Sequence, residues 1–377
     1  MKIIYVHTTD LAKKDTSETF IFNNAVSLAE EGIETHLFIT NRSDKSGENL
    51  LKEKFNLQSL PSNLFLNAVR LKGKSNWPFY RTVASAIKQD RFSDAIIITR
   101  KHSVLPHLLL AKQKFQKVFF ETHDFFFDLS LRNDIQKSSR RKQSIIERLF
   151  FRKLDGLICL NRFQKDLYEK RLNIPVVMFQ TGFRKPHINN TEKKNQLLYI
   201  GALEERKGIE NILNLAELLD KDYSVVIIGS RRVQEIKNLK SEIEKRGVAD
   251  RVEVKEWQSK RYLNELLSQS KIGLLPLKEG YFNEYLTVPL KYFDYAAFGL
   301  PVIGSDFPSL AEYIRDGYNG YLVDWSDLSQ VKEKIVGIVS DDNKWKAFSD
   351  NQLRSSKDLT WQRRAKDQIE YFKRLNK

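Results

Sequence analysis

Cysteine is nearly absent from this sequence, since Cys159 is the only one among 377 residues. A single cysteine excludes a disulfide framework and a metal site built from several thiolates. Cys159 stands in the apolar run 157–160, which predicts a small core residue and fits a reducing cytoplasm.

Long hydrophobic runs are also missing, because no apolar run approaches the roughly 18 residues of a membrane-spanning helix. The strand-like start, residues 2–6, lacks the length and flanks of a signal peptide. We therefore expect a cytoplasmic protein without an integral membrane segment. No Gly-x-Gly-x-x-Gly follows this first strand, which argues against a nicotinamide-dependent oxidoreductase.

Acidic residues are outnumbered: 48 Asp and Glu face 63 Lys and Arg, which gives a formal charge of +15. Such a balance predicts a polyanionic neighbour, either nucleic acid, an acidic glycan or an anionic membrane surface. Basic and apolar residues mix between Arg140 and Lys153, which is typical of a surface helix that rests on anionic lipid at the inner face of the cell membrane. A solvated helix with one core-facing stripe explains this segment equally well. No RNA-binding motif surrounds the aromatic residues 125–127, so nucleic acid is not an expected partner.

Short apolar runs alternate with helical periodicity along most of the chain, which predicts parallel sheets built from βαβ units. The polar segment 184–194 has the composition of a linker. We therefore expect an α/β protein with an N-terminal domain at 1–183 and a C-terminal domain at 184–359. The expected strands are 3–6, 35–40, 95–99, 118–121, 157–160 and 176–179 in the first domain, and 197–200, 224–228, 252–255, 272–276, 302–304 and 321–323 in the second.

The segment 289–303 is the most informative part of the sequence. Pro289 is tolerated at the start of a helix, Gly299 is able to end it, and the apolar residues to Ile303 read as a buried strand. The helix therefore has an open N-terminus behind the loop 279–288. Its unpaired N–H groups and positive dipole end suit a phosphate.

This segment resembles the retaining glycosyltransferases of family 4, which have the GT-B fold. Many of them carry Pro-x-Lys-x-Phe-Glu-Tyr-x-Ala-x-Gly-x-Pro-Val-Ile, and this chain matches it with Asp294 in place of the glutamate. The resemblance implies two Rossmann-like domains facing a central cleft, with the last helix, within 360–377, packing back on the first domain. It also implies a nucleotide-sugar donor, an acceptor site in the first domain, and no metal or other cofactor.

A second matching motif is Gly201–Gly208, which ends a strand and opens a helix. It resembles the family's Gly-Arg-x-x-x-x-Lys-Gly, in which the lysine and arginine hold the donor diphosphate. Lys207 matches that lysine, and its ammonium suits a departing diphosphate. The arginine position is Ala202, and Arg206 is a candidate replacement, although a solvated ion pair explains Arg206 equally well.

The acceptor-side candidate is His123, which follows a strand and resembles the family histidine that contacts the donor sugar and assists catalysis. His7 is a weaker candidate of the same kind. In the phosphate-binding loop, the backbone of Thr287 and Val288 lies where the family contacts the diphosphate.

The acidic positions of the family are only partly kept. Asp294 matches the residue that holds the ribose, whereas the position of the sugar-binding glutamate falls on Leu286, and Glu284 is the candidate to replace it. Gly229 and Ser230 end another strand where a base or phosphate could approach, although a plain turn explains them too. Glu312 resembles a family glutamate near the donor site and is also explained as a charge near a helix start.

Together these motifs predict a retaining glycosyltransferase that moves a sugar from a nucleotide-diphosphate sugar to a saccharide or lipid-linked acceptor, in surface polysaccharide or glycoconjugate assembly. Two alternatives stay open: a sugar-nucleotide epimerase of the same fold, and a non-catalytic glycan-binding protein. The sequence does not identify the donor sugar or the acceptor.

Overall fold

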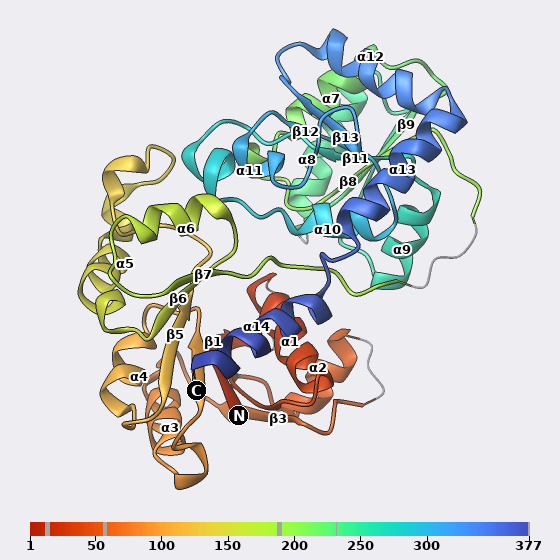
Figure 1. Ribbon diagram of the computed structural model, residues 1–377. Coiled ribbons are helices and arrows are strands. Elements are labelled where there is room, and N and C mark those ends of the chain that lie inside the picture. The colour runs from red at the N-terminus through yellow and green to blue at the C-terminus, as the bar shows by residue number, and fades with distance from the viewer. Residues whose placement is uncertain (12–15, 56–58, 187–190, 231, 376–377) are drawn as a thin grey trace. The chain divides into compact units, whose positions relative to one another are not determined.

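The computed structural model describes residues 1–11, 16–55, 59–186, 191–230 and 232–375. The chain divides into two compact units, one formed by Met1–Thr181 with Trp361–Lys377 and the other by Gly182–Thr360. Each unit contains one parallel sheet with helical connections (Figure 1), which confirms the predicted pair of Rossmann-like α/β domains. Residues 187–190 of the expected linker lie outside the described part of the chain.

The first unit has a seven-stranded sheet in the order β3-β2-β1-β4-β5-β6-β7. Its strands are β1 (Lys2–Asp10), β2 (Glu34–Asn41), β3 (Leu64–Arg70), β4 (Ile96–Thr99), β5 (Lys117–Glu121), β6 (Gly156–Cys159) and β7 (Val176–Met178). Its helices are α1 (Thr16–Glu30), α2 (Gly47–Phe55), α3 (Trp77–Ile87), α4 (Leu105–Ala111), α5 (Lys137–Phe150), α6 (Arg162–Glu169) and α14 (Trp361–Leu375).

The strands of the first unit follow the sequence prediction except at β3. That strand pairs only with β2, at the edge of the sheet, and most of its side chains are half-buried or exposed. A strand covered on both faces reads as a continuous apolar run, as in Ile96–Thr99, whereas an edge strand carries no such signal. The weak pattern of Leu64–Arg70 therefore hid it.

The last helix, α14, is part of the first unit. The ring of Trp361 meets Phe20 of α1 edge-on at 4.9 Å between centroids, and Phe372 meets Phe119 of β5 at 5.1 Å. Both ends of α14 are thus anchored by aromatic contacts, so residues distant in sequence complete this core.

The second unit has a six-stranded sheet in the order β10-β9-β8-β11-β12-β13. Its strands are β8 (Gln196–Ile200), β9 (Ser224–Ile228), β10 (Val252–Lys255), β11 (Ile272–Leu275), β12 (Val302–Ser305) and β13 (Gly320–Val323). Its helices are α7 (Ile209–Leu218), α8 (Val233–Lys245), α9 (Lys260–Gln269), α10 (Leu290–Ala297), α11 (Pro308–Ala311), α12 (Leu328–Val339) and α13 (Asp342–Ser356).

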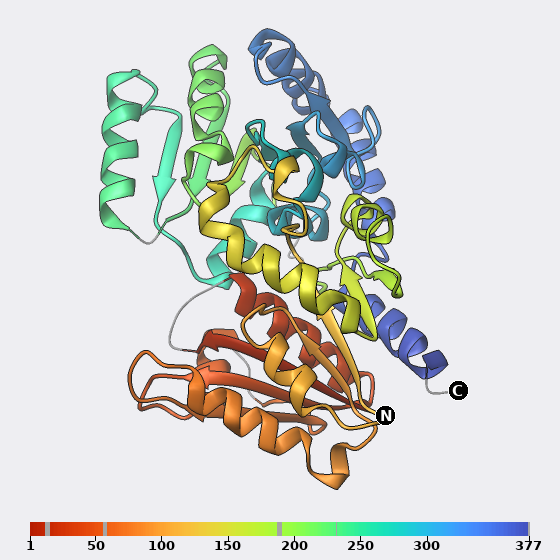
Figure 2. The ribbon, with the colours of Figure 1, turned by 90° about the vertical axis from the view of Figure 1, so that its left-hand side faces the viewer.

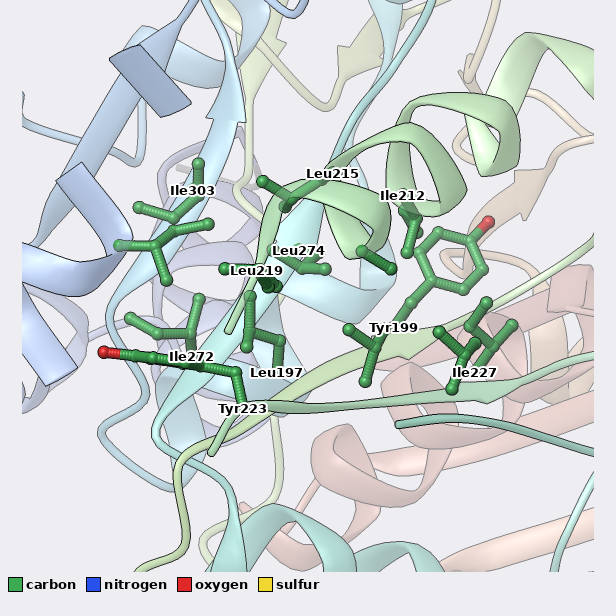
Figure 3. Close-up of a cluster of buried hydrophobic side chains, with 14 of the residues drawn as sticks. Leu197, Tyr199, Ile212, Leu215, Leu219, Tyr223, Ile227, Ile272, Leu274 and Ile303 are labelled. Atoms are coloured by element: carbon green, nitrogen blue, oxygen red, sulfur yellow. The ribbon is translucent and has the colours of Figure 1, made fainter. Parts of the chain in front are cut away.

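Side chains of the second sheet alternate between two apolar cores. Leu197 and Tyr199 of β8 join one cluster with α7 (Figure 3), and Leu198 and Ile200 join another that includes residues of α9 and α10. Because successive side chains of a strand point to opposite faces, burial on both faces holds the strand firmly in register. This rigid sheet fixes where its carboxyl-end loops emerge.

Candidate functional site

The predicted donor-side residues all follow carboxyl ends of strands in the second sheet. From β8 the chain winds toward β10 at one edge, and from β11 it winds toward β13 at the other, so the direction reverses between β8 and β11. Connections leave such a switch point on opposite sides, and the crevice between them is where open α/β sheets bind ligands.

The turn after β8 places Lys207 at this switch point. Glu205–Lys207 forms a 3₁₀ turn, and Gly208 follows with a left-handed φ of +71°. A Cβ atom on Gly208 would lie 1.6 Å from the carbonyl oxygen of Pro276, just beyond β11. Only glycine permits this close approach, which fixes the turn against the neighbouring strand.

The ammonium of Lys207 lies near enough to the carboxylate of Glu204 to feel its charge, but it is not paired with it. Within the described residues it makes no hydrogen bond or ion pair, and its side chain is half-buried. Desolvation, and then the charge of Arg206, lower the pKa of Lys207 to about 8. Arg206 itself is exposed and pairs with Glu204 at 2.6 Å. The structure therefore places Lys207, but not the Arg206 guanidinium, as an unpaired cation at the switch point.

The loop between β11 and α10 is tied to that turn by Asn283. The side-chain amide of this buried residue donates to the carbonyl oxygens of Arg206 at 3.0 Å and Lys278 at 2.7 Å. The hydroxyl of Ser309 in turn donates to the carbonyl oxygen of Asn283. These bonds join loops from β8, β11 and β12 into one framework.

Thr287 and Val288 lead from this loop into α10. Thr287 is buried and its N–H donates to the carbonyl oxygen of Phe282, while Val288 is half-buried. Pro289 caps the eight-residue helix, and Gly299 follows its end with a φ of +66°. The predicted start and end of this helix are confirmed, and its first turn opens at the switch point.

The acidic candidates are engaged in local contacts. The carboxylate of Glu284 accepts from the N–H of Gly280 at 2.8 Å, and Leu286 is buried, with 1% of its surface exposed. Asp294 on α10 pairs with Lys260 at 2.9 Å. A ribose or sugar hydroxyl at these carboxylates would have to share or replace those partners.

The turn after β9 holds Gly229 and Ser230. A Cβ atom on Gly229 would lie 1.9 Å from the carbonyl oxygen of Gly201, so this glycine lets two carboxyl-end turns pack together. Ser230 has a left-handed φ of +54°, and its hydroxyl donates to Glu235. Such strain in a non-glycine residue persists only where its surroundings enforce it. Glu312 is half-buried just after α11.

Sequence reasoning missed Lys291, Tyr199 and Asn283. Lys291 belongs to the matched helix motif, and its ammonium lies over the ring of Tyr199, 3.7 Å from the centroid. Nothing in the sequence signals this contact. Asn283 lies in a loop whose hydrogen bonds depend on the packing of distant strands. Only three-dimensional contacts reveal these residues.

In the first unit, His123 follows β5. Its side chain is partly open to solvent. The pKa of its imidazole is lowered, by desolvation first and then by the charges of Arg100 and His102. A lowered pKa favours the neutral ring near pH 7. His7 on β1 is buried, and desolvation followed by nearby cations lowers its pKa well below the usual range.

Glu121, two residues before His123, is the centre of a buried charge cluster. Its carboxylate accepts hydrogen bonds from Arg364 of α14 and from the Tyr5 hydroxyl, and Arg100 lies 3.7 Å from it. Arg364 also donates to the carbonyl oxygens of Phe179 and Gln180. This cluster ties α14 to the carboxyl end of β5 and positions the backbone that leads to His123.

The basic helix α5 has the mixed surface that its sequence predicts. Arg140, Arg141 and Lys142 are exposed, and so are the apolar residues Ile145 and Leu149, by 56% and 59%. Figure 2 shows α5 lengthwise, in yellow. No helix in the described part of the chain is long and apolar enough to span a bilayer.

The second unit is similar to a known protein family. A family model described as glycosyl transferases group 1 matches residues 182–355, which is nearly the whole second unit. The uncharacterized glycosyltransferase MJ1178 of Methanocaldococcus jannaschii is 25% identical over 232 residues, which cover 59% of this chain and 61% of that protein. The chain thus matches less than two thirds of this relative's length.

Similar solved structures cover both units. Sucrose-phosphate synthase from Thermosynechococcus elongatus superposes with a TM-score of 0.76 at 14% identity, covering 99% of this chain and 98% of that one. HepE of Anabaena, solved with UDP and glucose, gives a TM-score of 0.74 at 12% identity and covers 99% of each chain. At such identities the likeness establishes the fold, and the predicted GT-B fold is confirmed.

Proposed function

Since the family model of glycosyl transferases group 1 matches residues 182–355 and the whole chain has the GT-B fold, we propose that this protein is a retaining glycosyltransferase. It moves a sugar from a nucleotide-diphosphate sugar to a saccharide or lipid-linked acceptor, in surface polysaccharide or glycoconjugate assembly. The observation that carries the proposal is the unpaired cation Lys207 at the β8–β11 switch point, from which α10 also begins.

In this proposal the leaving diphosphate is stabilised by charge and by backbone donors. Lys207 neutralises the developing negative charge, while the first turn of α10 after Thr287 and Val288 offers N–H groups and a positive dipole end. Arg206, on the same turn as Lys207, adds a second positive charge once it exchanges Glu204 for phosphate. No metal takes part, because these groups perform the task that a divalent cation would otherwise perform.

The donor's remaining groups are assigned by the resemblance and by position. Asp294 binds the ribose and Glu284 the sugar hydroxyls, while Gly229, Ser230 and Glu312 border the nucleotide or sugar. From the first unit, His123 positions the sugar as a neutral hydrogen-bonding ring. The relative HepE, whose structure contains UDP and glucose, supports a nucleotide-sugar donor.

The acceptor side is proposed to work at an anionic membrane. Helix α5 presents basic residues together with exposed Ile145 and Leu149, the combination with which interfacial helices bind lipid headgroups. This supports a cytoplasmic protein at the inner face of the cell membrane and favours a lipid-linked acceptor.

The deciding experiment is calorimetric titration with UDP, GDP, ADP, CMP and dTDP, with and without magnesium, on wild type and Lys207→Ala. Selective binding that magnesium does not change and that Lys207→Ala weakens supports the proposal. Absence of binding by every nucleotide contradicts it and favours a non-catalytic glycan-binding protein. Release of nucleoside diphosphate that requires an added acceptor then separates a transferase from an epimerase.

A further inference from the structure

A second lysine ammonium lies at the β8–β11 switch point. The Nζ atom of Lys291, on the first turn of α10, is buried, and within the described residues it has no hydrogen-bond partner. It lies 3.7 Å from the centroid of the Tyr199 ring. A Cβ atom on Gly201 would be 2.8 Å from this Nζ, so the ammonium borders the backbone that leaves β8.

This arrangement is unfavourable for the protein without a ligand. A buried ammonium loses its hydration, and the contact with an aromatic face offsets only part of that loss. Lys207 is near enough to add repulsion: desolvation first, and then the charge of Lys207, lower the pKa of Lys291 well below its usual range. Neither lysine has a carboxylate partner within the described residues, so the two positive charges at this switch point repel each other.

An anion with two charged groups would remove this cost. The diphosphate of a nucleotide sugar has two charged phosphates, one for each lysine. Because the lysine ammonium ends a flexible four-carbon chain, it is able to move to a phosphate that lies away from its resting place. Gly201 lacks a side chain at the place that the end of the Lys291 stem occupies, so no side chain of Gly201 confines it. Tyr199 is fixed because its hydroxyl donates to the carbonyl oxygen of Ala202 at 2.7 Å.

We propose that Lys291 is a second diphosphate-binding residue, which rests on the Tyr199 ring in the empty protein and extends to a phosphate beside Lys207 when the donor binds. This inference rests on the proposed function and adds Lys291 to it. Lys207 lies on a turn, whereas Lys291 lies on a helix with its Nζ 3.7 Å from the centroid of the Tyr199 ring. The binding of the diphosphate thus uses one cation from each side of the switch point, Lys207 after β8 and Lys291 after β11.

The test combines affinity with stability in three variants of the full chain. Lys291→Met keeps the stem but removes the charge, Lys291→Arg keeps the charge, and Lys237→Met removes an exposed lysine on α8 as a matched control. Calorimetric titration with inorganic pyrophosphate measures the diphosphate site without depending on the base, and thermal unfolding without ligand measures the cost of the buried ammonium.

We expect Lys291→Met to bind pyrophosphate about tenfold or more weakly than wild type. The same change should raise the melting temperature of the empty protein by about 2 °C or more, because an unpaired buried charge is gone. Lys291→Arg should retain most of the affinity, and Lys237→Met should change neither quantity. A supporting role for the Tyr199 ring alone would instead lower the melting temperature of Lys291→Met.

Two results overturn the inference. If wild type and Lys291→Met bind pyrophosphate equally, Lys291 does not contact the diphosphate, while the proposed function stands on Lys207. If wild type does not bind pyrophosphate, the two lysines do not form a diphosphate site, and the proposed function is then judged separately by the nucleotide titration.

Discussion

Positively charged side chains have different partners at the switch points of the two sheets. Beside the first, between β1 and β4, the guanidinium of Arg364 binds Glu121, and Arg100 lies 3.7 Å from the same carboxylate. At the second, between β8 and β11, Lys207 and Lys291 have no carboxylate partner within the described residues. The cations at the first switch point therefore share a buried carboxylate, whereas the lysines at the second are not paired with one.

This difference separates cations that hold structure from cations that are available for a ligand. A buried guanidinium that is paired and also bound to backbone carbonyls gains nothing from an incoming anion. An unpaired, partly desolvated ammonium has no partner to give up, so it keeps the full attraction to an incoming anion. The contrast explains why we place the diphosphate in the second unit, although both sheets have the same kind of switch point.

The largest effect is expected when the paired side of the comparison is broken. Arg364→Ala leaves the carboxylate of Glu121 buried without its main partner and should destabilise the first unit by about 3 to 5 kcal/mol. Urea unfolding followed by circular dichroism measures this loss. Glu121→Gln combined with Arg364→Met removes both charges and should recover much of the stability. If Arg364→Ala and wild type unfold at the same urea concentration, the cluster does not hold α14.

On the unpaired side, Lys207 should affect turnover rather than stability. Lys207→Ala removes the charge that stabilises the departing diphosphate and should lower kcat by about 10²- to 10³-fold, with little change in unfolding. A steady-state assay of nucleoside diphosphate release gives this ratio. Lys240→Ala, on the exposed face of α8, is the matched control. Equal kcat values for Lys207→Ala and wild type would mean that this unpaired cation does not stabilise the departing diphosphate.

A smaller effect should appear in the pH dependence of binding. Lys207 has a pKa of about 8, so its ammonium is present below that pH and is lost above it. Affinity for a nucleoside diphosphate should therefore fall as pH rises through about 8, by up to about tenfold per unit. Lys207→Arg should flatten this fall, because a guanidinium stays charged. Titrations at several pH values test it, and affinity that rises with pH would contradict it.

The smallest effect concerns a surface outside both switch points. Arg141→Gln on α5 should weaken binding to vesicles that contain anionic lipid by about fivefold, since one basic residue near a charged surface contributes about 1 kcal/mol. Sedimentation with phosphatidylserine vesicles measures the change, and Lys237→Gln on α8 is the control. If both variants bind as wild type does, α5 is not the lipid-facing helix.

Much of the architecture could be predicted from the sequence because buried strands and helix ends leave local signals. The apolar runs located every strand of the second sheet, and Pro289 and Gly299 marked the ends of α10. The edge strand β3 had no such signal, since its residues are covered on one side at most.

The candidate site could be predicted only in part. Lys207 could be proposed because it matches the lysine of a family motif and a glycine follows it. Lys291 was not, because its burial over Tyr199 depends on the pairing of β8 with β11, which joins segments far apart in the chain. The same reason hid Arg364, whose carboxylate partner is in the first third of the sequence.

The helix α14 gives the first unit a discontinuous sequence, which matters while the protein is being synthesised. On the ribosome the sheet residues up to Thr181 emerge first, but the aromatic surface that Trp361 and Phe372 cover waits for about 180 further residues. At ordinary elongation rates this delay is roughly 10 to 40 s. The second unit, contiguous in sequence, is able to fold earlier, and during this interval the nascent first unit exposes the apolar surface that α14 later covers.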